Sequence, residues 1–149
     1  MTSLDSCLLS LLDEAFDKKS WHGANLRNSL RGVNAHAAAW RPAPGLHNIW
    51  EYALHAAYWK YAARRRITGE KRGSFVLPGS NFFPRPVEAT EAAWKHDVEI
   101  LVTMHQDLRY AVVHLKSTSP KIEHLIRGAA AHDLYHAGQI RLLRRMMKS

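Results

Sequence analysis

The apolar residues of this chain recur at the spacing of α-helices, and this periodicity limits the possible folds more than any other feature of the sequence. The C-terminal segment 121–147 shows it best when its residues are placed about 100° apart on a helical wheel. One stripe of that wheel holds the apolar residues Ile122, Leu125, Ile126, Ala129, Ile140, Leu143 and Met147. No segment alternates between apolar and polar residues over the length of a strand. The sequence therefore predicts an all-α fold.

Breaks rich in glycine, proline and serine divide the chain into four long helices and one short one. The predicted helices are 3–18, a short stretch from the N-cap Asn25 through Leu30, 49–67, a segment from Thr90 to the 117–120 break, and 121–147. Asn48 and Glu51 have the spacing of a capping box before the second long helix. Four long helices argue for a four-helix bundle. Residues 68–89 predict a long loop between the second and third main helices, packed back on the bundle through its phenylalanines.

The composition is that of one globular domain, residues 1–149. No apolar run reaches the roughly 20 residues of a membrane span, the N-terminus lacks the pattern of a signal peptide, and the single cysteine, Cys7, fits a reducing compartment. We therefore expect a cytoplasmic protein with no membrane partner. The net charge of +8 could attract nucleic acid. Basic clusters at predicted helix ends have a structural explanation, however, and no nucleic-acid recognition motif accompanies them.

Two histidines stand on the apolar stripe of the last predicted helix. His132 and His136 are four residues apart, so their imidazoles project side by side from adjacent turns, in the middle of the stripe. Asp133 lies on the same stripe. Burying these polar groups costs several kcal/mol unless each finds a partner, and a divalent metal ion suits two such imidazoles. The alternative is a pair of core histidines that are hydrogen-bonded separately.

A third histidine, His55, lies in the middle of the predicted helix 49–67, which is apolar almost all round. Three neutral nitrogen donors from two helices leave one coordination position open, as in catalytic metal sites. His47 lies two turns earlier and could be a fourth ligand, but its place before the N-cap favours a supporting or substrate-facing role. The remaining histidines do not converge in this prediction and are interpreted as structural or incidental: His22, His36, His96, His105, His114 and His124.

Two histidine-bearing segments, HNIWEYALHAAYW at 47–59 and GAAAHDLYHAGQIRLLR at 128–144, resemble the DinB-like superfamily. The segment WHGANL at 21–26 is also similar, so the resemblance spans nearly the whole chain. It implies a four-helix bundle that binds a divalent metal through three histidines, matching His55, His132 and His136. It also implies a homodimer and a metal-dependent activity, either a transferase that activates a low-molecular-weight thiol or a hydrolase.

The leading functional hypothesis is a metal-dependent enzyme that converts a small molecule at the three-histidine site. The metal, which could be zinc, nickel, iron, copper or manganese, would activate the sulfur of a small thiol or a water molecule. Asp133 could orient a ligand histidine, and Gln139 could offer a polar contact. The alternatives are a binding module without turnover and, less favoured by the sequence, a nucleic-acid-binding protein.

Overall fold

The computed structural model describes residues 2–148, and every regular element in that range is a helix. The prediction of an all-α fold is confirmed. The helices are α1 (Ser3–Phe16), α2 (Leu26–Leu30), α3 (Ala35–Ala39), α4 (Ile49–Thr68), α5 (Glu91–Val113) and α6 (Pro120–Met147). No helix within residues 2–148 is both long enough and apolar enough to cross a membrane.

The helices begin at residues whose side chains accept a hydrogen bond from the backbone three positions later. The predicted N-caps Asn25 and Asn48 are confirmed, and Asn48 forms the expected capping box with Glu51. Thr90, predicted as the start of a helix, is the N-cap of α5. Such caps satisfy backbone N–H groups that the first helical turn leaves without partners. The sequence prediction missed α3, a short run of small residues capped by Asn34. Five residues are too few to show an apolar period, so only the cap announces this helix.

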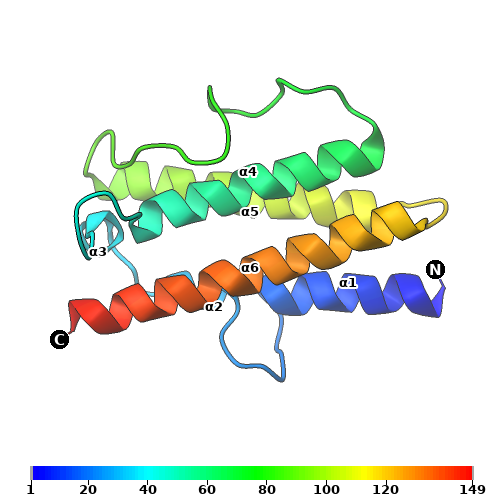
Figure 1. Ribbon diagram of the computed structural model, residues 1–149, viewed down its shortest axis with the longest axis horizontal. Helices are drawn as coiled ribbons and strands as arrows, with labels where there is room; N and C mark the ends of the chain where they lie inside the picture. Colours follow the sequence, from blue (N-terminus) through cyan, green and yellow to red (C-terminus); the bar gives the residue numbers. More distant parts are fainter. Residues whose placement is uncertain (1, 149) are drawn as a thin grey trace.

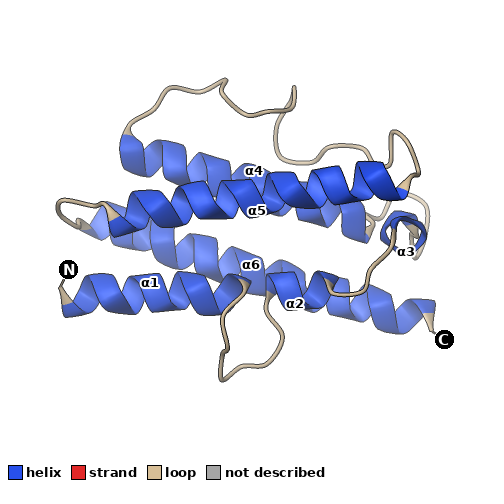
Figure 2. Cartoon of the chain, turned by 180° about the vertical axis from the view of Figure 1, so that it is seen from behind, coloured by secondary structure: helices blue, strands red, loops and turns tan. Residues whose placement is uncertain are grey.

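The four long helices, α1, α4, α5 and α6, lie side by side along the long axis of the molecule (Figures 1 and 2). α4 and α5 run in the same direction, so residues 69–90, which contain no helix or strand, return along the length of α4 (Figure 1). α4 contacts both α5 and α6. Apolar side chains between these helices form the core, and those of Leu12, Leu26, Ile49, Leu54, Leu101, Leu108, Ile126 and Ile140 are fully buried.

The returning segment 69–90 is fixed at its end by ion pairs and hydrogen bonds. The guanidinium of Arg41 donates to both carboxylate oxygens of Glu51, at 2.6 and 2.8 Å. The backbone N–H of Arg85 donates to the same carboxylate at 3.0 Å, and the Arg85 side chain pairs with Asp97 on α5 at 2.8 Å. Although burial opposes ionisation, these hydrogen bonds lower the pKa of Glu51 to about 2. These contacts hold the end of the segment beside Glu51, which lies one helical turn before His55 on α4.

Candidate metal centre

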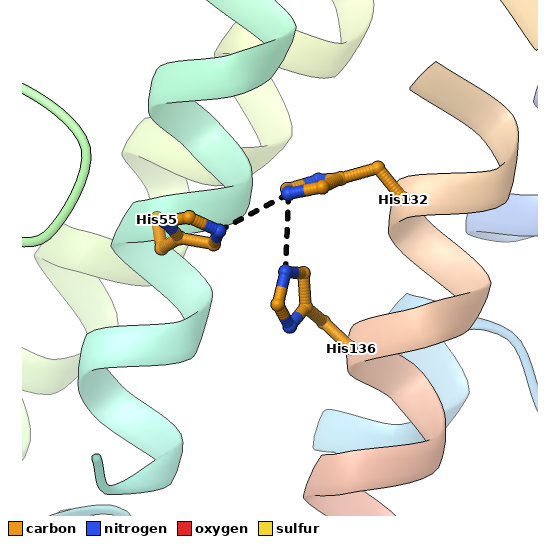
Figure 3. A group of neighbouring side chains, drawn as sticks. All are labelled: His55, His132 and His136. Atoms are coloured by element: carbon orange, nitrogen blue, oxygen red, sulfur yellow. Dashed lines mark hydrogen bonds between the residues drawn. The ribbon is translucent and has the colours of Figure 1, made fainter. Parts of the chain in front are cut away.

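Three histidines from two helices converge between α4 and α6. Figure 3 shows His55 projecting from α4 toward His132 and His136 on α6. The Nε2 atom of His132 lies 3.1 Å from Nε2 of His55 and 3.0 Å from Nε2 of His136. One nitrogen of each ring lies within 4.8 Å of the others, close enough for the three to hold one metal ion. His55 and His136 are buried, and His132 is half-buried at the open side of the cluster.

The other ring nitrogen of two of these histidines is held by an oxygen atom. Nδ1 of His55 lies 3.0 Å from the backbone carbonyl oxygen of Asn81, and Nδ1 of His136 lies 2.6 Å from Oε1 of Gln139. A carbonyl oxygen can only accept, so Nδ1 of each neutral ring carries the proton and donates it. Nε2 is then left with a lone pair, as a metal ligand requires, and the ring orientation is fixed.

The surroundings of the cluster keep its imidazoles neutral. Burial, followed by the charges of neighbouring histidines, lowers the pKa of His55 to about 4. Burial also lowers the pKa of His132 to about 3, with smaller effects from His136, His55 and Lys60. Burial shifts the pKa of His136 downward as well. At neutral pH, all three rings therefore present unprotonated nitrogens, the form that binds metal ions.

The spacing of the Nε2 atoms fits a common metal ligand sphere. Nitrogens about 2.1 Å from one zinc ion lie roughly 3.0 to 3.4 Å apart for bond angles between about 90° and 109°. The observed 3.0 and 3.1 Å separations lie at the short end of that range. The Nδ1 protons of His55 and His136 are already donated to oxygen atoms, so Nε2 of both rings can only accept a hydrogen bond. The three Nε2 atoms therefore cannot all be satisfied by hydrogen bonds to one another. A cation resolves this conflict.

The returning segment 69–90 forms one wall of the site. The Phe82 ring stacks on His55, with ring centroids 4.0 Å apart, and on His47, at 3.6 Å. His47 also places Nδ1 3.1 Å from Glu51, so it lies beside the cluster and not among the three converging nitrogens. Asn81 has a positive φ of 67°, a conformation that asparagine tolerates better than most residues. Its side chain accepts a hydrogen bond from Nε1 of Trp59 at 2.9 Å.

Asn81 and Phe82 were not among the residues that the sequence analysis selected for the site. Sequence reasoning predicted that this segment packs back on the helices but gave no register for the contact. The only local signal is the asparagine itself, which is one of the few residues other than glycine to enter the left-handed region.

Asp133 occupies a different place from the predicted one. Its carboxylate accepts a hydrogen bond from Nζ of Lys60 at 2.5 Å through Oδ2, and its Oδ1 has no hydrogen-bond partner within residues 2–148, so it does not orient a ligand histidine by a hydrogen bond. Nζ of Lys60 also lies 3.1 Å from Nδ1 of His105 and 4.7 Å from the centroid of the Phe16 ring. We call Lys60, His105 and Asp133 the lysine cluster. Burial raises the pKa of Asp133 to about 6, although the Lys60 ammonium acts in the opposite direction.

One further interpretation from the sequence is made specific here, and another is corrected. His105, interpreted as structural or incidental, is buried, stacked on Phe16 and part of the lysine cluster. The wheel placed His132 in the middle of the buried stripe, whereas Asp133 is fully buried there and His132 lies at its edge. The remaining histidines in the described range have exposed positions: His22, His36, His96, His114 and His124.

Comparison with known proteins adds no relative. No protein-family model, curated protein or solved structure matches the chain. The resemblance to the DinB-like superfamily therefore stays a prediction from the histidine-bearing segments.

Proposed function

We propose that this chain is a metal-dependent enzyme of the DinB-like superfamily, a four-helix bundle that acts on a small molecule at His55, His132 and His136. The observation that carries this proposal is the convergence of the three Nε2 atoms, with separations of 3.0 and 3.1 Å, while Nδ1 of two rings is held by oxygen. A structural metal site would normally use four protein ligands. Three imidazoles leave a coordination position for a substrate.

The reaction class that we favour is transfer to or from a low-molecular-weight thiol, with hydrolysis as the alternative. A bound zinc, nickel, iron or manganese ion would supply the Lewis acidity that lowers the pKa of a thiol or a water molecule. The chain itself contributes three neutral donors and fixes two of their rings through Asn81 and Gln139. It also leaves His132 half-exposed, so that a small molecule can approach from that side.

The stacked ring of Phe82 limits the access of water from the side of the returning segment 69–90. It covers one face of His55, and His47 covers the other face of Phe82. A ligand atom near the cluster would therefore meet a site that is apolar on one wall and open on the other. Such a shielded site strengthens electrostatic effects on a developing thiolate. The resemblance also implies a homodimer, which light scattering tests directly.

The decisive experiment measures metal content by mass spectrometry on protein purified without nickel. We expect near-stoichiometric metal in the wild type and its loss in His136→Ala. A matched control is His114→Ala, which removes an exposed histidine outside the cluster. Wild-type protein that takes up no zinc, nickel, iron or manganese would make the three histidines structural and end the proposal. Loaded protein is then assayed with thiols against electrophiles such as epoxides.

A further inference from the structure

A small cavity between α4 and α6 opens beside His132. Its volume is about 170 Å³, and its lining includes Trp59, Ala63, Arg66, Gly128 and Ala129 besides His132. Because Ala63, Gly128 and Ala129 are small, they leave this space open between α4 and α6. Ligand pockets typically have roughly 300 to 1,000 Å³, so this cavity suits a small molecule or one end of a longer one.

A second, larger cavity of about 570 Å³ borders two of the same side chains. The two share Trp59 and Arg66, and the second is bounded by the returning segment 69–90, including Phe75. The Arg66 guanidinium lies 5.9 Å from the centroid of the Trp59 ring, while that ring lies 6.3 Å from the ring of His132. Trp59 and Arg66 therefore border both the cavity beside His132 and the larger cavity.

The described residues that line the two cavities include arginines but no acidic residue. Arg65, Arg66 and Arg72 line the larger cavity, and neither cavity is lined by an aspartate or a glutamate. Within residues 2–148, none of these three arginines forms an ion pair with a carboxylate. The neighbouring Arg64, by contrast, is neutralised by Glu70 at 2.9 Å. Three cations without internal counter-charges, beside aromatic rings, favour an anionic ligand.

We infer that this double cavity binds a small organic anion, with its reacting atom beside His132 and its carboxylate or phosphate group at Arg66. The inference rests on the proposed function, because it names the class of substrate for the same centre. Arg65 and Arg72 would hold a second anionic group of a longer ligand. The Trp59 ring provides a flat apolar face for the chain that joins the two ends.

The test uses two thiols that differ in charge and are otherwise matched, ω-mercaptohexanoate and ω-mercaptohexanol. Each is titrated into zinc-loaded and metal-free protein by calorimetry. We expect the zinc-loaded wild type to bind the carboxylate roughly fivefold more tightly than the alcohol, the size of a partly exposed charge pair. Arg66→Gln should abolish this preference. Arg141→Gln removes the same charge from an exposed position of α6 that lines neither cavity, and should keep it.

A second pair of variants tests whether the thiols occupy the small cavity beside His132. A side chain added at Gly128 or at Gly138 meets no atom within 4 Å at its Cβ, so both variants should fold. Gly128→Met fills the small cavity and should weaken both thiols, whereas Gly138→Met, which lies outside both cavities, should not. Zinc content should be unchanged in both.

The outcomes separate this inference from the proposed function. Zinc-loaded wild type that binds both thiols equally, or Arg66→Gln that keeps the preference, overturns the anion site while leaving the metal centre standing. Wild type that takes up no zinc ends the proposed function. In that case, the metal-free titrations decide the anion site: a preference lost in Arg66→Gln supports it, and equal affinities overturn it.

Discussion

The interface between α4 and α6 holds two polar clusters, and they differ in how their polar groups are satisfied. In the lysine cluster, Lys60 and Asp133 are neutralised internally, with side chains only 2% and 1% exposed. His105 adds a contact from α5, and the Phe16 ring on α1 covers the ammonium, so all four long helices meet there. The three-histidine cluster uses only two helices and the returning segment, and its His132 reaches solvent.

This difference separates a structural role from a binding role within one interface. The lysine cluster contains both a cation and an anion, so its charges balance internally, although Nε2 of His105 and Oδ1 of Asp133 have no hydrogen-bond partner in the part of the chain that the structure describes. The three-histidine cluster contains only electron-pair donors that face one another and lie close enough to hold a metal ion. Burial acts in the same direction on the histidines of both clusters, because it lowers the pKa of His105 to about 2 and that of His132 to about 3. The presence of an internal cation, and not burial, distinguishes them.

The largest expected effect comes from breaking the lysine cluster. Lys60→Met leaves the Asp133 carboxylate buried without its cation, which should lower the free energy of unfolding by about 3 to 5 kcal/mol. Urea denaturation measures it. Replacing both residues in Lys60→Met/Asp133→Leu should recover most of the loss, because no uncompensated charge remains. A single variant within about 1 kcal/mol of the wild type would mean that the pair contributes little.

The next effect belongs to the three-histidine cluster and appears only with metal. Zinc at a hundredfold excess over its dissociation constant should raise the free energy of unfolding of the wild type by about 2.7 kcal/mol. His132→Ala should show no such increase, and its metal-free stability should change by only about 1 kcal/mol, because the side chain is half-buried. Urea denaturation with and without zinc measures both. An equal zinc increment in His132→Ala would remove this residue from the ligand set.

A smaller effect is expected from the partner of a ligand. Gln139→Ala removes the acceptor that fixes the His136 ring, so zinc affinity should fall by about 10- to 100-fold. Competition with a chromophoric chelator gives the affinity. Gln106→Ala, on the exposed face of α5, is the matched control and should bind zinc like the wild type. Unchanged affinity in Gln139→Ala would show that the ring is oriented by packing alone.

The last effect concerns pH, and it is the smallest when counted per pH unit. Burial, with the charges of Lys60, Arg109 and Lys18, lowers the pKa of His105 to about 2, whereas an unfolded chain titrates near 6.5. Between these values the unfolded chain binds a proton that the folded protein does not, so stability falls as the pH falls, by up to about 1.4 kcal/mol per pH unit.

His105→Gln tests this contribution, because an amide can still accept from Lys60 but does not titrate in this range. Unfolding measured between pH 6 and pH 4 should show a shallower loss of stability in the variant than in the wild type. Equal slopes would mean that His105 is already protonated in the folded protein. The slope that remains in the variant should include His55 and His132, whose pKa values are lowered to about 4 and about 3.

Features that depend on local spacing could be predicted from the sequence. The four-residue separation of His132 and His136 fixes their common side of α6, and the asparagine and threonine caps mark where helices begin. The wheel for α6 was slightly misdirected because it weighs apolar residues alone. It placed Asp133 on the same stripe as His132, and it could not show that Asp133 is fully buried while His132 is only half-buried.

Features that depend on three or more elements could not be predicted. The lysine cluster joins residues from α4, α5 and α6, and no spacing within one helix reveals that Lys60 and His105 meet. Similarly, the contact of Asn81 with His55 depends on the path of a segment without periodicity. Such contacts depend on tertiary packing, which propensity and pattern do not encode.

The atom that holds the His55 ring belongs to the main chain. Because the backbone carbonyl of Asn81 accepts the Nδ1 proton, every amino acid at that position carries the same acceptor, provided that the backbone keeps its path. Side chains of the returning segment can therefore diverge during evolution, changing what the neighbouring cavity accepts, without altering the tautomer of the ligand. In the proposed function, the residues that select the ligand would thus be separate from the main-chain atom that orients a metal-binding histidine.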